Sequence, residues 1–273
     1  MDPTAIDDAD VLVASVARTN VQLFNQLSAQ SRPDSELARI RRAYDLAARL
    51  YSGAYQADGK PFITHVVSVS SILALLDQPS TLVAAALLHN VYNNADFGDG
   101  LRRTENSKRR RFVRAAVGED VETLIHGFAQ RRIDRHLSEL VDNVEQLSET
   151  ERQLVIMDLA DLLEKYLDQG VLYFGQGEWV TGFAERRLED LVCLSDRVGQ
   201  PVLGEALRRA IGAARNARIP EVLRSSGERK YVDFLPPLSY RRKLHVVLQQ
   251  VRFTRMYRWL RSIKHRVIHP KTG

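Results

Sequence analysis

The sequence predicts an all-α protein, a helical bundle followed by a basic amphipathic helical tail. Apolar residues recur with the period of helices along most of the 273 residues, and the alternating pattern of strands is almost absent. Charge is uneven: residues 218–273 hold 14 Lys/Arg and 3 Asp/Glu, net +11, and the remainder holds 25 and 31, net −6, which sums to +5. We therefore expect a helical domain at 1–219, a linker at 220–239 and a basic tail at 240–273.

Two helices are expected before the central segment. The first runs from Asp8 to Leu27, where apolar residues follow a helix period. The sequence SRPDS then breaks the helix and caps a second one, from Glu36 to Tyr51. This pair is expected to lead into the core of the bundle.

The central segment is expected to form two buried helices that each carry a histidine. The proline of GKPF suits a first helical turn because it has no N–H to leave unpaired, and the helix that follows contains His65. Ser80 is the expected N-cap of a helix from Thr81 to Tyr92, which is apolar on nearly every face and has His89 near its end. Polar residues at the end of such a helix need partners.

Those partners can come from a long helix between Ser148 and Leu167. Ser148 and Glu151 form the pattern of a capping box, and Asp158 and Asp161 lie near the apolar stripe of the helix. A carboxylate on an inward stripe must be paired, protonated or bound to a metal, because a bare buried charge is too costly. Two histidines and an inward aspartate on three helices would make a site.

The rest of the bundle also follows helical periods. Helices are expected at Glu119 to Gln130, Ile133 to Val144, Glu178 to Leu194 and Pro201 to Ala214. The stretch VLYFGQGEW, residues 171–179, is expected to be a loop whose aromatic side chains cover the core.

A basic run, Lys108 to Arg111, follows the loop after Asn94. Such a run is typical of a solvated helix face, which is the interpretation we favour. The alternative is that it contacts phosphates at the mouth of the site.

Three motifs carry a family resemblance. GKPFITH, TLVAAALLHNVYNN and VIMDLADLL, in this order, resemble GxPYxxH, TLxAALLHDVVEDT and LKLADRLHN of the HD-domain metal-dependent phosphohydrolases. Among these, the chain resembles the Rel/SpoT-type alarmone (guanosine tetra/pentaphosphate) hydrolases, over roughly Leu37 to Gly170. FVRAAVGEDVETLIHGF also looks like the family segment FGxEVAxLVxGV. The resemblance implies an HD-domain-like helical bundle.

The resemblance also implies a metal site with one altered ligand. In the family, two histidines, the aspartate of the HD pair and a distant aspartate hold a divalent metal. The matching residues are His65, His89, Asn90 and Asp161. An amide oxygen can ligate a hard cation but brings no formal charge, so a site for manganese, iron or zinc is expected to be weakened.

The catalytic and ligand-binding positions of the family are altered too. A Glu-Asp pair that helps to activate and orient the attacking water is replaced by Asn93 and Asn94, whose amides cannot take a proton near neutral pH. The resemblance places the ligand-binding positions at Gln56, Lys60, Leu162 and Lys165.

Each of these residues also has a plain structural interpretation. His65 and His89 could be hydrogen-bonded core histidines left from an ancestral site, and the asparagines could satisfy backbone groups at a helix end. Asp161 could pair with a nearby arginine or a helix N-terminus. A further alternative is that Asp96 or Asp99 folds back to replace the missing carboxylates.

Composition limits the compartment and the partners. The single cysteine excludes an internal disulfide, and no apolar run reaches the roughly 20 residues that span a bilayer. A cytoplasmic protein is expected. Residues 240–268 have the pattern of a basic amphipathic helix, which could dock on the acidic domain, lie on an anionic membrane surface, or bind nucleic acid or an acidic partner.

Two functions remain open from the sequence. The favoured one is a degenerate HD-domain protein, weak or inactive as a hydrolase, that acts as a ligand-binding, regulatory or scaffold module for a phosphorylated small molecule or nucleotide. The alternative is a divergent metal-dependent phosphohydrolase acting on a nucleotide or another phosphate ester.

Overall fold

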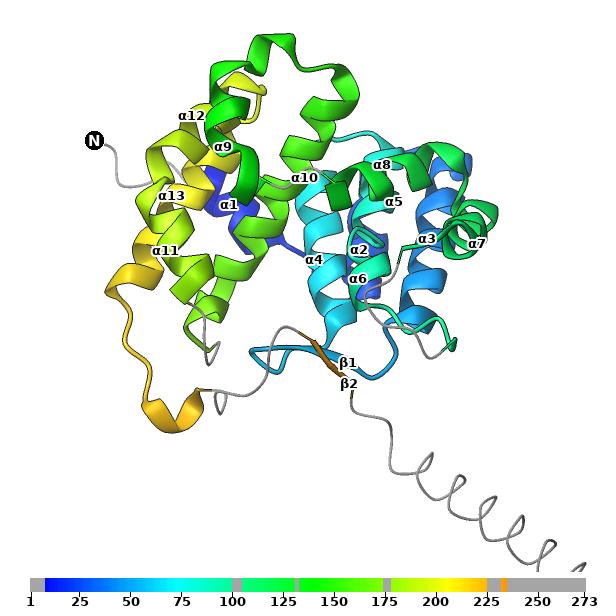
Figure 1. Ribbon diagram of the computed structural model, residues 1–273, viewed down its shortest axis with the longest axis horizontal. Helices are drawn as coiled ribbons and strands as arrows, with labels where there is room; N and C mark the ends of the chain where they lie inside the picture. The colour runs from blue at the N-terminus through cyan, green and yellow to red at the C-terminus, as the bar shows by residue number, and fades with distance from the viewer. Residues whose placement is uncertain (1–7, 100–104, 131–132, 174–177, 225–231, 235–273) are drawn as a thin grey trace, which may run out of the picture. The chain divides into compact units, whose positions relative to one another are not determined.

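The computed structural model confirms the all-α prediction, because helices make up most of what it describes and the strands described have only three residues each (Figure 1). It describes residues 8–99, 105–130, 133–173, 178–224 and 232–234. The described residues up to Asp233 belong to one compact unit, Met1–Asp233. The domain boundaries expected at residues 219 and 239 stay predictions.

Most of the described helices are joined by connections of one to six residues. In chain order they are α1 (Asp8–Ser15), α2 (Asn20–Ala29), α3 (Asp34–Leu50), α4 (Phe62–Leu75), α5 (Ser80–Ala86), α6 (Val91–Asn94), α7 (Ser107–Val117), α8 (Glu119–Gln130), α9 (Ile133–Asp142), α10 (Glu149–Tyr166), α11 (Glu178–Arg186), α12 (Leu188–Arg197) and α13 (Pro201–Asn216). The short elements are the 3-10 turns η1 (Val144–Gln146), η2 (Leu167–Tyr173) and η3 (Glu221–Leu223), and the strands β1 (Ala54–Gln56) and β2 (Val232–Phe234), which pair with each other.

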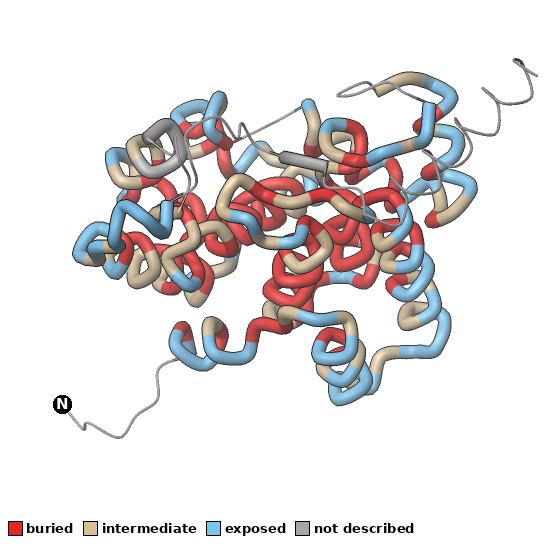
Figure 2. The backbone as a smooth tube through the Cα atoms, turned by 90° about the horizontal axis from the view of Figure 1, so that it is seen from below, coloured by how far each residue is buried: buried red, intermediate tan, exposed pale blue. Residues whose placement is uncertain are grey.

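The core lies around α4, α5 and α10. Helix α5 packs against α3 and α4, and α10 packs against α4, α8 and α13. All residues of α5 except Thr81 are buried. Figure 2 shows buried stretches gathered in the interior and exposed stretches around them. Polar side chains on these three helices are therefore held in an apolar environment.

The first predicted helix is wrong in one respect, because two helices replace it. Thr19 accepts a hydrogen bond from the Gln22 backbone N–H, and the Gln22 side chain accepts from the Thr19 backbone N–H, which completes a capping box. This box starts α2, and the Ala17 backbone N–H donates to Ser71 Oγ at 2.8 Å. The helix expected after SRPDS is confirmed, and starts at Asp34.

The predicted central helix from Thr81 to Tyr92 is also interrupted. Ser80 is the first residue of α5 rather than its N-cap, which is Pro79. The chain then leaves the α-helix, since the N–H of Leu88 donates to the carbonyl of Ala85 and the N–H of Val91 donates to that of Leu88. This tight turn carries His89 and ends where α6 begins.

The later helices are largely as predicted. The capping box of Ser148 and Glu151 is confirmed at the start of α10, and α8 has the expected bounds. The helix expected from Glu178 to Leu194 is wrong as a single element, because Arg187 separates α11 from α12. There the Arg187 guanidinium bonds to Asp190, three residues ahead. The first part of the loop expected at 171–179 belongs to η2, and Phe174 and the side chain of Trp179 lie outside what is described.

The basic run Lys108 to Arg111 is part of α7, and its residues differ in how far they are exposed to solvent. Lys108 and Arg111 are exposed, as expected for a solvated face. Arg109 is only 2% exposed, so the solvated-face interpretation is wrong for this residue. Its guanidinium binds Asp99 through Nε at 2.9 Å and lies over the Phe97 ring, 4.4 Å from the centroid.

The basic tail falls outside the described residues, so residues 240–268 keep only their predicted role. Sedimentation with anionic vesicles, with and without the segment from Ser239 onward, would test it. Within the described part of the chain, no helix has both the length and the apolar character that crossing a membrane requires.

Candidate metal and phosphate site

Two histidines and an aspartate converge at the centre of the bundle. His65 lies on α4, His89 lies in the turn after α5, and Asp161 lies on α10. Their ligand atoms lie within 4.8 Å of one another. Asp161 Oδ1 is 3.2 Å from His65 Nε2 and 3.4 Å from His89 Nε2. The candidate site that the three motifs indicate therefore exists as a geometric unit.

An aromatic ring packs against each of the two buried imidazoles. Asp161 is fully buried, and His65 and His89 are at most 2% exposed. The two imidazoles meet edge to face, with centroids 5.2 Å apart, and Phe128 packs against His89 at 5.0 Å. Phe62 packs against His65 in the same manner at 5.3 Å. This aromatic packing fixes both ring planes.

Hydrogen bonds at Nδ1 set which nitrogen of each histidine faces Asp161. His89 Nδ1 lies 2.6 Å from the carbonyl oxygen of Ala86, which can only accept, so Nδ1 carries the hydrogen. His65 Nδ1 lies 2.5 Å from Glu164 Oε2, and that carboxylate likewise accepts. In the neutral form of each ring, the lone pair is on Nε2. Both lone pairs are then directed to the same point, next to a carboxylate oxygen.

This donor set fits a divalent metal in part. Imidazole Nε2 atoms and a carboxylate oxygen are ligands for zinc, iron and manganese, and a carboxylate or carbonyl on the far nitrogen is the usual support for such a histidine. His89 Nε2 is buried and makes no hydrogen bond among the described residues. His65, His89 and Asp161 could thus hold an ion, with one ligand fewer than the four of a closed tetrahedral site.

The surrounding charges act on the two histidines in opposite directions. Burial lowers the pKa of His89, and the neighbouring Asp161 offsets only part of that effect. Burial would lower the pKa of His65 too, but the carboxylates of Glu164 and Asp161 outweigh it and raise the pKa. Protonated His65 can donate to both carboxylates, whereas a metal requires its neutral form.

Each buried carboxylate of the site has a lysine of its own. Lys165 Nζ lies 2.6 Å from Asp161 Oδ2, and Lys60 Nζ pairs with Glu164 Oε1. Burial would raise the pKa of Asp161, but Lys165 and the two histidines hold it well below its usual range. In the same way, His65 and Lys60 lower the pKa of Glu164 to about 2 against the effect of burial. Both groups are therefore carboxylates at neutral pH.

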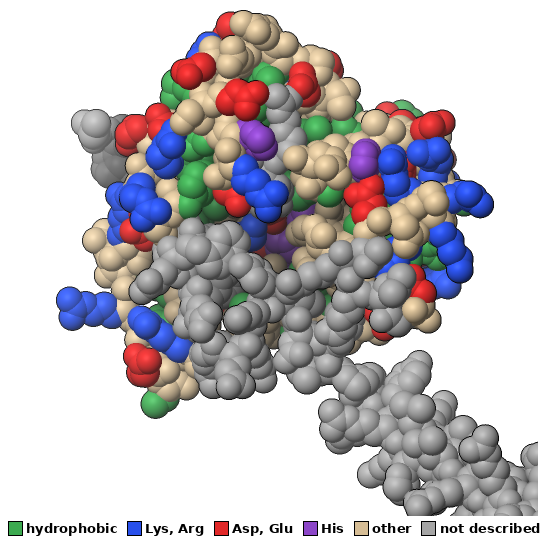
Figure 3. All heavy atoms as spheres, viewed as in Figure 1, with side chains coloured by type: hydrophobic (Ala, Val, Ile, Leu, Met, Phe, Trp, Pro, Cys, Tyr) green, Lys and Arg blue, Asp and Glu red, His purple; other side chains and the backbone are tan. Residues whose placement is uncertain are grey.

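The two lysines connect the buried site to its rim. Their side chains are 20% (Lys60) and 17% (Lys165) exposed, while the carboxylates that they contact have no exposed surface. Figure 3 shows basic side chains beside a recessed histidine on one face of the molecule. The turn that carries Lys60 is closed by the hydrogen bond from Gln56 N–H to the Lys60 carbonyl, at 2.8 Å.

Glu164 was missed by sequence reasoning, although it supports the whole arrangement. It is fully buried and contacts both His65 and Lys60. It occupies the position of the histidine in the family motif LKLADRLHN, three residues after Asp161. That spacing, which places both side chains on one helix face, is the signal that could have identified it.

The predicted asparagine positions surround the turn after His89. Asn90 is half-buried, and its backbone carbonyl accepts from the N–H groups of Asn93 and Asn94. Asn93 is exposed and Asn94 is half-buried. Asn90 as a fourth ligand, and Asn93 and Asn94 as catalytic residues, stay predictions.

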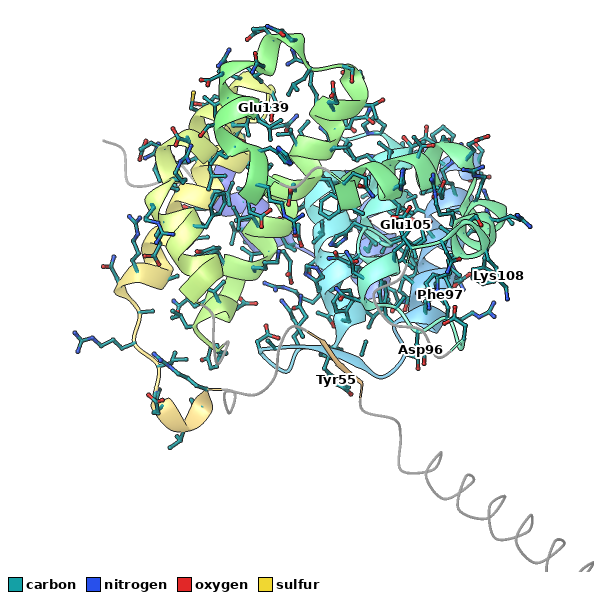
Figure 4. The ribbon with its side chains drawn as sticks, viewed as in Figure 1. Tyr55, Asp96, Phe97, Glu105, Lys108 and Glu139 are labelled. Carbon is teal, nitrogen blue, oxygen red and sulfur yellow. The ribbon has the colours of Figure 1, made fainter. Side chains whose placement is uncertain are left out.

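The alternative carboxylates do not join the site. Asp99 binds the Arg109 guanidinium, and Asp96 Oδ1 accepts from the Gly98 backbone N–H at 2.8 Å. Figure 4 labels Asp96 and Phe97 at the lower right of the described helices, near Lys108. Asp158, the other inward carboxylate of α10, accepts from Ile133 N–H at 2.7 Å, at the start of α9.

The remaining ligand-binding predictions occupy two environments. Gln56 is 7% exposed at the end of β1, and Leu162 is 9% exposed on α10, next to Asp161. Lys60 and Lys165 hold the two carboxylates described above. Whether any of the four contacts a ligand stays a prediction.

A cluster of hydrogen bonds around buried Glu122 links α6 to α7 and α8. The hydroxyl of Tyr92 donates to Glu122 Oε1 at 2.9 Å, and Glu122 also accepts from Arg110 and Arg114. Glu122 has no exposed surface, and although burial would raise its pKa, these partners lower it. The helix that carries the asparagines is thereby fixed to α8.

Comparison with known proteins gives relatives over short stretches. A family model described as a domain of unknown function (DUF6817) matches residues 47–135, a range that includes both histidines but not Asp161. A GTP pyrophosphokinase of Streptomyces coelicolor is 39% identical over 70 residues, 25% of this chain and 8% of that protein. The bifunctional (p)ppGpp synthase/hydrolase SpoT of Escherichia coli is 38% identical over 68 residues, 25% of this chain and 10% of SpoT.

Two further matches extend the comparison. A probable GTP pyrophosphokinase of Mycobacterium leprae is 30% identical over 111 residues, 36% of this chain and 14% of that protein. A solved structure described as a metazoan ortholog of SpoT that hydrolyzes ppGpp covers 68% of this chain and 98% of its own, with 19% identity and a TM-score of 0.45. The chain spans only a small part of the curated relatives. Over stretches of about 70 residues, the chain is therefore similar to a GTP pyrophosphokinase and to the (p)ppGpp synthase/hydrolase SpoT.

Proposed function

We propose that the protein is a degenerate HD-domain-like module that binds a phosphorylated nucleotide and hydrolyses it weakly or not at all. The observation that carries the proposal is the ion pair between Lys165 and Asp161, at 2.6 Å, at a site where three acids of the family motif are replaced by asparagine. Together these changes remove negative charge where a divalent cation needs it.

The charge argument starts from the carboxylates that remain. Asp161 contacts both histidines and Glu164 contacts His65, and each of the two carboxylates is already neutralised by a lysine. A dication bound to the two Nε2 atoms would therefore find both nearby carboxylates already paired with a lysine. The amides of Asn90, Asn93 and Asn94 bring no formal charge. Removing a dication from water is costly unless negative ligands replace the hydration. We therefore expect low affinity for divalent metal.

The same lysines favour an anionic ligand at the rim. A lysine ammonium has three donors, and Lys60 and Lys165 are partly exposed, so each can contact a phosphate as well as its carboxylate. The relatives named above act on GTP or (p)ppGpp, which are polyanionic guanine nucleotides. We take a nucleotide of this class as the ligand, with Gln56 and Leu162 as candidate neighbours.

A second candidate function is a divergent metal-dependent phosphohydrolase. It is supported by the orientation of the histidines, whose Nδ1 atoms are bonded to Glu164 and the Ala86 carbonyl. In this case His65, His89, Asn90 and Asp161 would hold the ion. A metal such as manganese, iron or zinc supplies Lewis acidity toward a phosphate oxygen and lowers the pKa of bound water.

One experiment separates the two functions. The full chain is purified, dialysed and analysed for manganese, iron and zinc, and binding of ppGpp is then measured by calorimetry with and without EDTA. We expect substoichiometric metal, nucleotide binding that survives EDTA, and hydrolysis near background in added Mn²⁺. A near-equimolar metal retained through dialysis, together with hydrolysis that EDTA abolishes, would establish the second function.

A further inference from the structure

The Asp161 carboxylate is divided between two kinds of partner. Oδ1 lies 3.2 and 3.4 Å from the histidine Nε2 atoms, and Oδ2 lies 2.6 Å from Lys165 Nζ. Asp161 and Lys165 are four residues apart on α10, which places both on one face of the helix. The backbone of α10 therefore holds Lys165 beside Asp161. Among the described residues, Asp161 is the only carboxylate in the candidate metal group.

We propose that Lys165 acts as a tethered cation that opposes divalent-metal binding at Asp161. A metal at the Nε2 atoms would share Asp161 with an ammonium group and would be repelled by it. Asp161 cannot supply its full charge to both cations. The inference deepens the proposed function, on which it rests, since it names the residue that sets the low metal affinity.

Lys60 differs from Lys165 in position. It pairs with Glu164, which bonds to Nδ1 of His65, the nitrogen that faces away from Asp161. Lys60 therefore supports the orientation of His65, while Lys165 contacts the candidate metal ligand itself. Only the second lysine is in direct competition with an ion.

The test is metal binding by the full chain with Lys165 replaced. Mn²⁺ affinity is measured by calorimetry for the parent and for Lys165→Met, which keeps most of the length of the side chain but removes its charge. We expect the affinity to rise roughly ten- to a hundredfold, a change of the same size as the loss that follows when a supporting partner of a metal ligand is removed. Lys165→Arg keeps the charge and should bind as the parent does.

A control variant separates the local effect from a change in net charge. Lys108→Met removes one positive charge from an exposed position on α7, which is labelled in Figure 4. Its Mn²⁺ affinity should match that of the parent. If Lys165→Met folds and binds Mn²⁺ no more tightly than Lys108→Met, the proposal is overturned.

A measurement on the parent covers the case in which Lys165→Met fails to fold. The Lys165 side-chain nitrogen is followed by ¹⁵N NMR during titration with Zn²⁺, and its resonance is assigned by its absence in Lys165→Arg. Competition predicts that the resonance shifts as Zn²⁺ saturates the site, and an unmoved resonance at saturation overturns the proposal. Failure of the proposed function would give a different result, because the parent protein would then retain near-equimolar metal through dialysis.

Discussion

Replacing Glu164 with glutamine should reduce the free energy of unfolding by about 3 kcal/mol at pH 7. Glu164 is fully buried, bonds to His65 Nδ1 at 2.5 Å and pairs with Lys60. These partners lower its pKa from the ordinary 4.5 to about 2. A shift of this size at about 1.4 kcal/mol per unit corresponds to roughly 3 kcal/mol of stabilisation by the ionised form.

The sign of the pH dependence follows from the direction of the shift. A carboxyl group whose pKa is lowered by folding stabilises the protein above the unfolded pKa, and loses that contribution as pH falls through the folded pKa. The difference between the parent and Glu164→Gln should therefore be complete at pH 7. Near pH 3, between the two pKa values of 4.5 and about 2, about half of it should remain.

Urea unfolding at pH 7 and pH 3 measures this difference. A suitable control is Glu145→Gln, because the Glu145 side chain is 75% exposed and its ion pair with Arg197 is long, at 3.4 Å. That variant should change stability by less than about 0.5 kcal/mol. A loss for Glu164→Gln below about 1 kcal/mol at pH 7, or one that is equal at the two pH values, would refute the reasoning.

Two further changes test the turn after His89 and the helix that follows it. The first restores three acids of the family motif: Asn90→Asp, Asn93→Glu and Asn94→Asp. Mn²⁺ binding should increase, because negative charge returns beside the histidines; if the folded triple variant binds no more Mn²⁺ than the parent, the helices no longer present these positions to one point. The second is Tyr92→Phe, which removes a donor from buried Glu122 and should cost about 1.5 to 3 kcal/mol in thermal or urea unfolding. Tyr55→Phe at a half-buried position serves as its control, and equal effects of both changes would contradict an anchoring role for Tyr92.

The fold was predictable wherever a local signal agreed with the apolar period. The capping box at Ser148 placed the start of α10, and the bounds of α8 followed from its period. The break before α2 was missed because the apolar period continues through it, although Thr19 and Gln22 carry the signal of a capping box. The turn at His89 has no proline or glycine, so periodicity alone could not show it.

The site was predictable only as far as the motifs reached. His65, His89 and Asp161 were identified by the family pattern and lie together. The charged side chains that determine the protonation of these three residues were not identified as their partners. Such contacts depend on which side chains approach one another in the folded chain. Lys60 pairs with Glu164 across 104 residues of sequence, and no local pattern reports such a contact.

The combination of retained and altered residues bears on what the site is for. A core histidine needs only one hydrogen-bond partner, yet His65 has carboxylates at both nitrogens and His89 directs its Nε2 to the same aspartate. Such an arrangement is costly in an apolar core, since Asp161 and Glu164 must both be desolvated. The lysines offset that cost and also bring positive charge to the rim, where a phosphate can reach it. Under the proposed function, the ammonium groups of Lys60 and Lys165 at this rim are where the phosphate of a bound nucleotide would make contact.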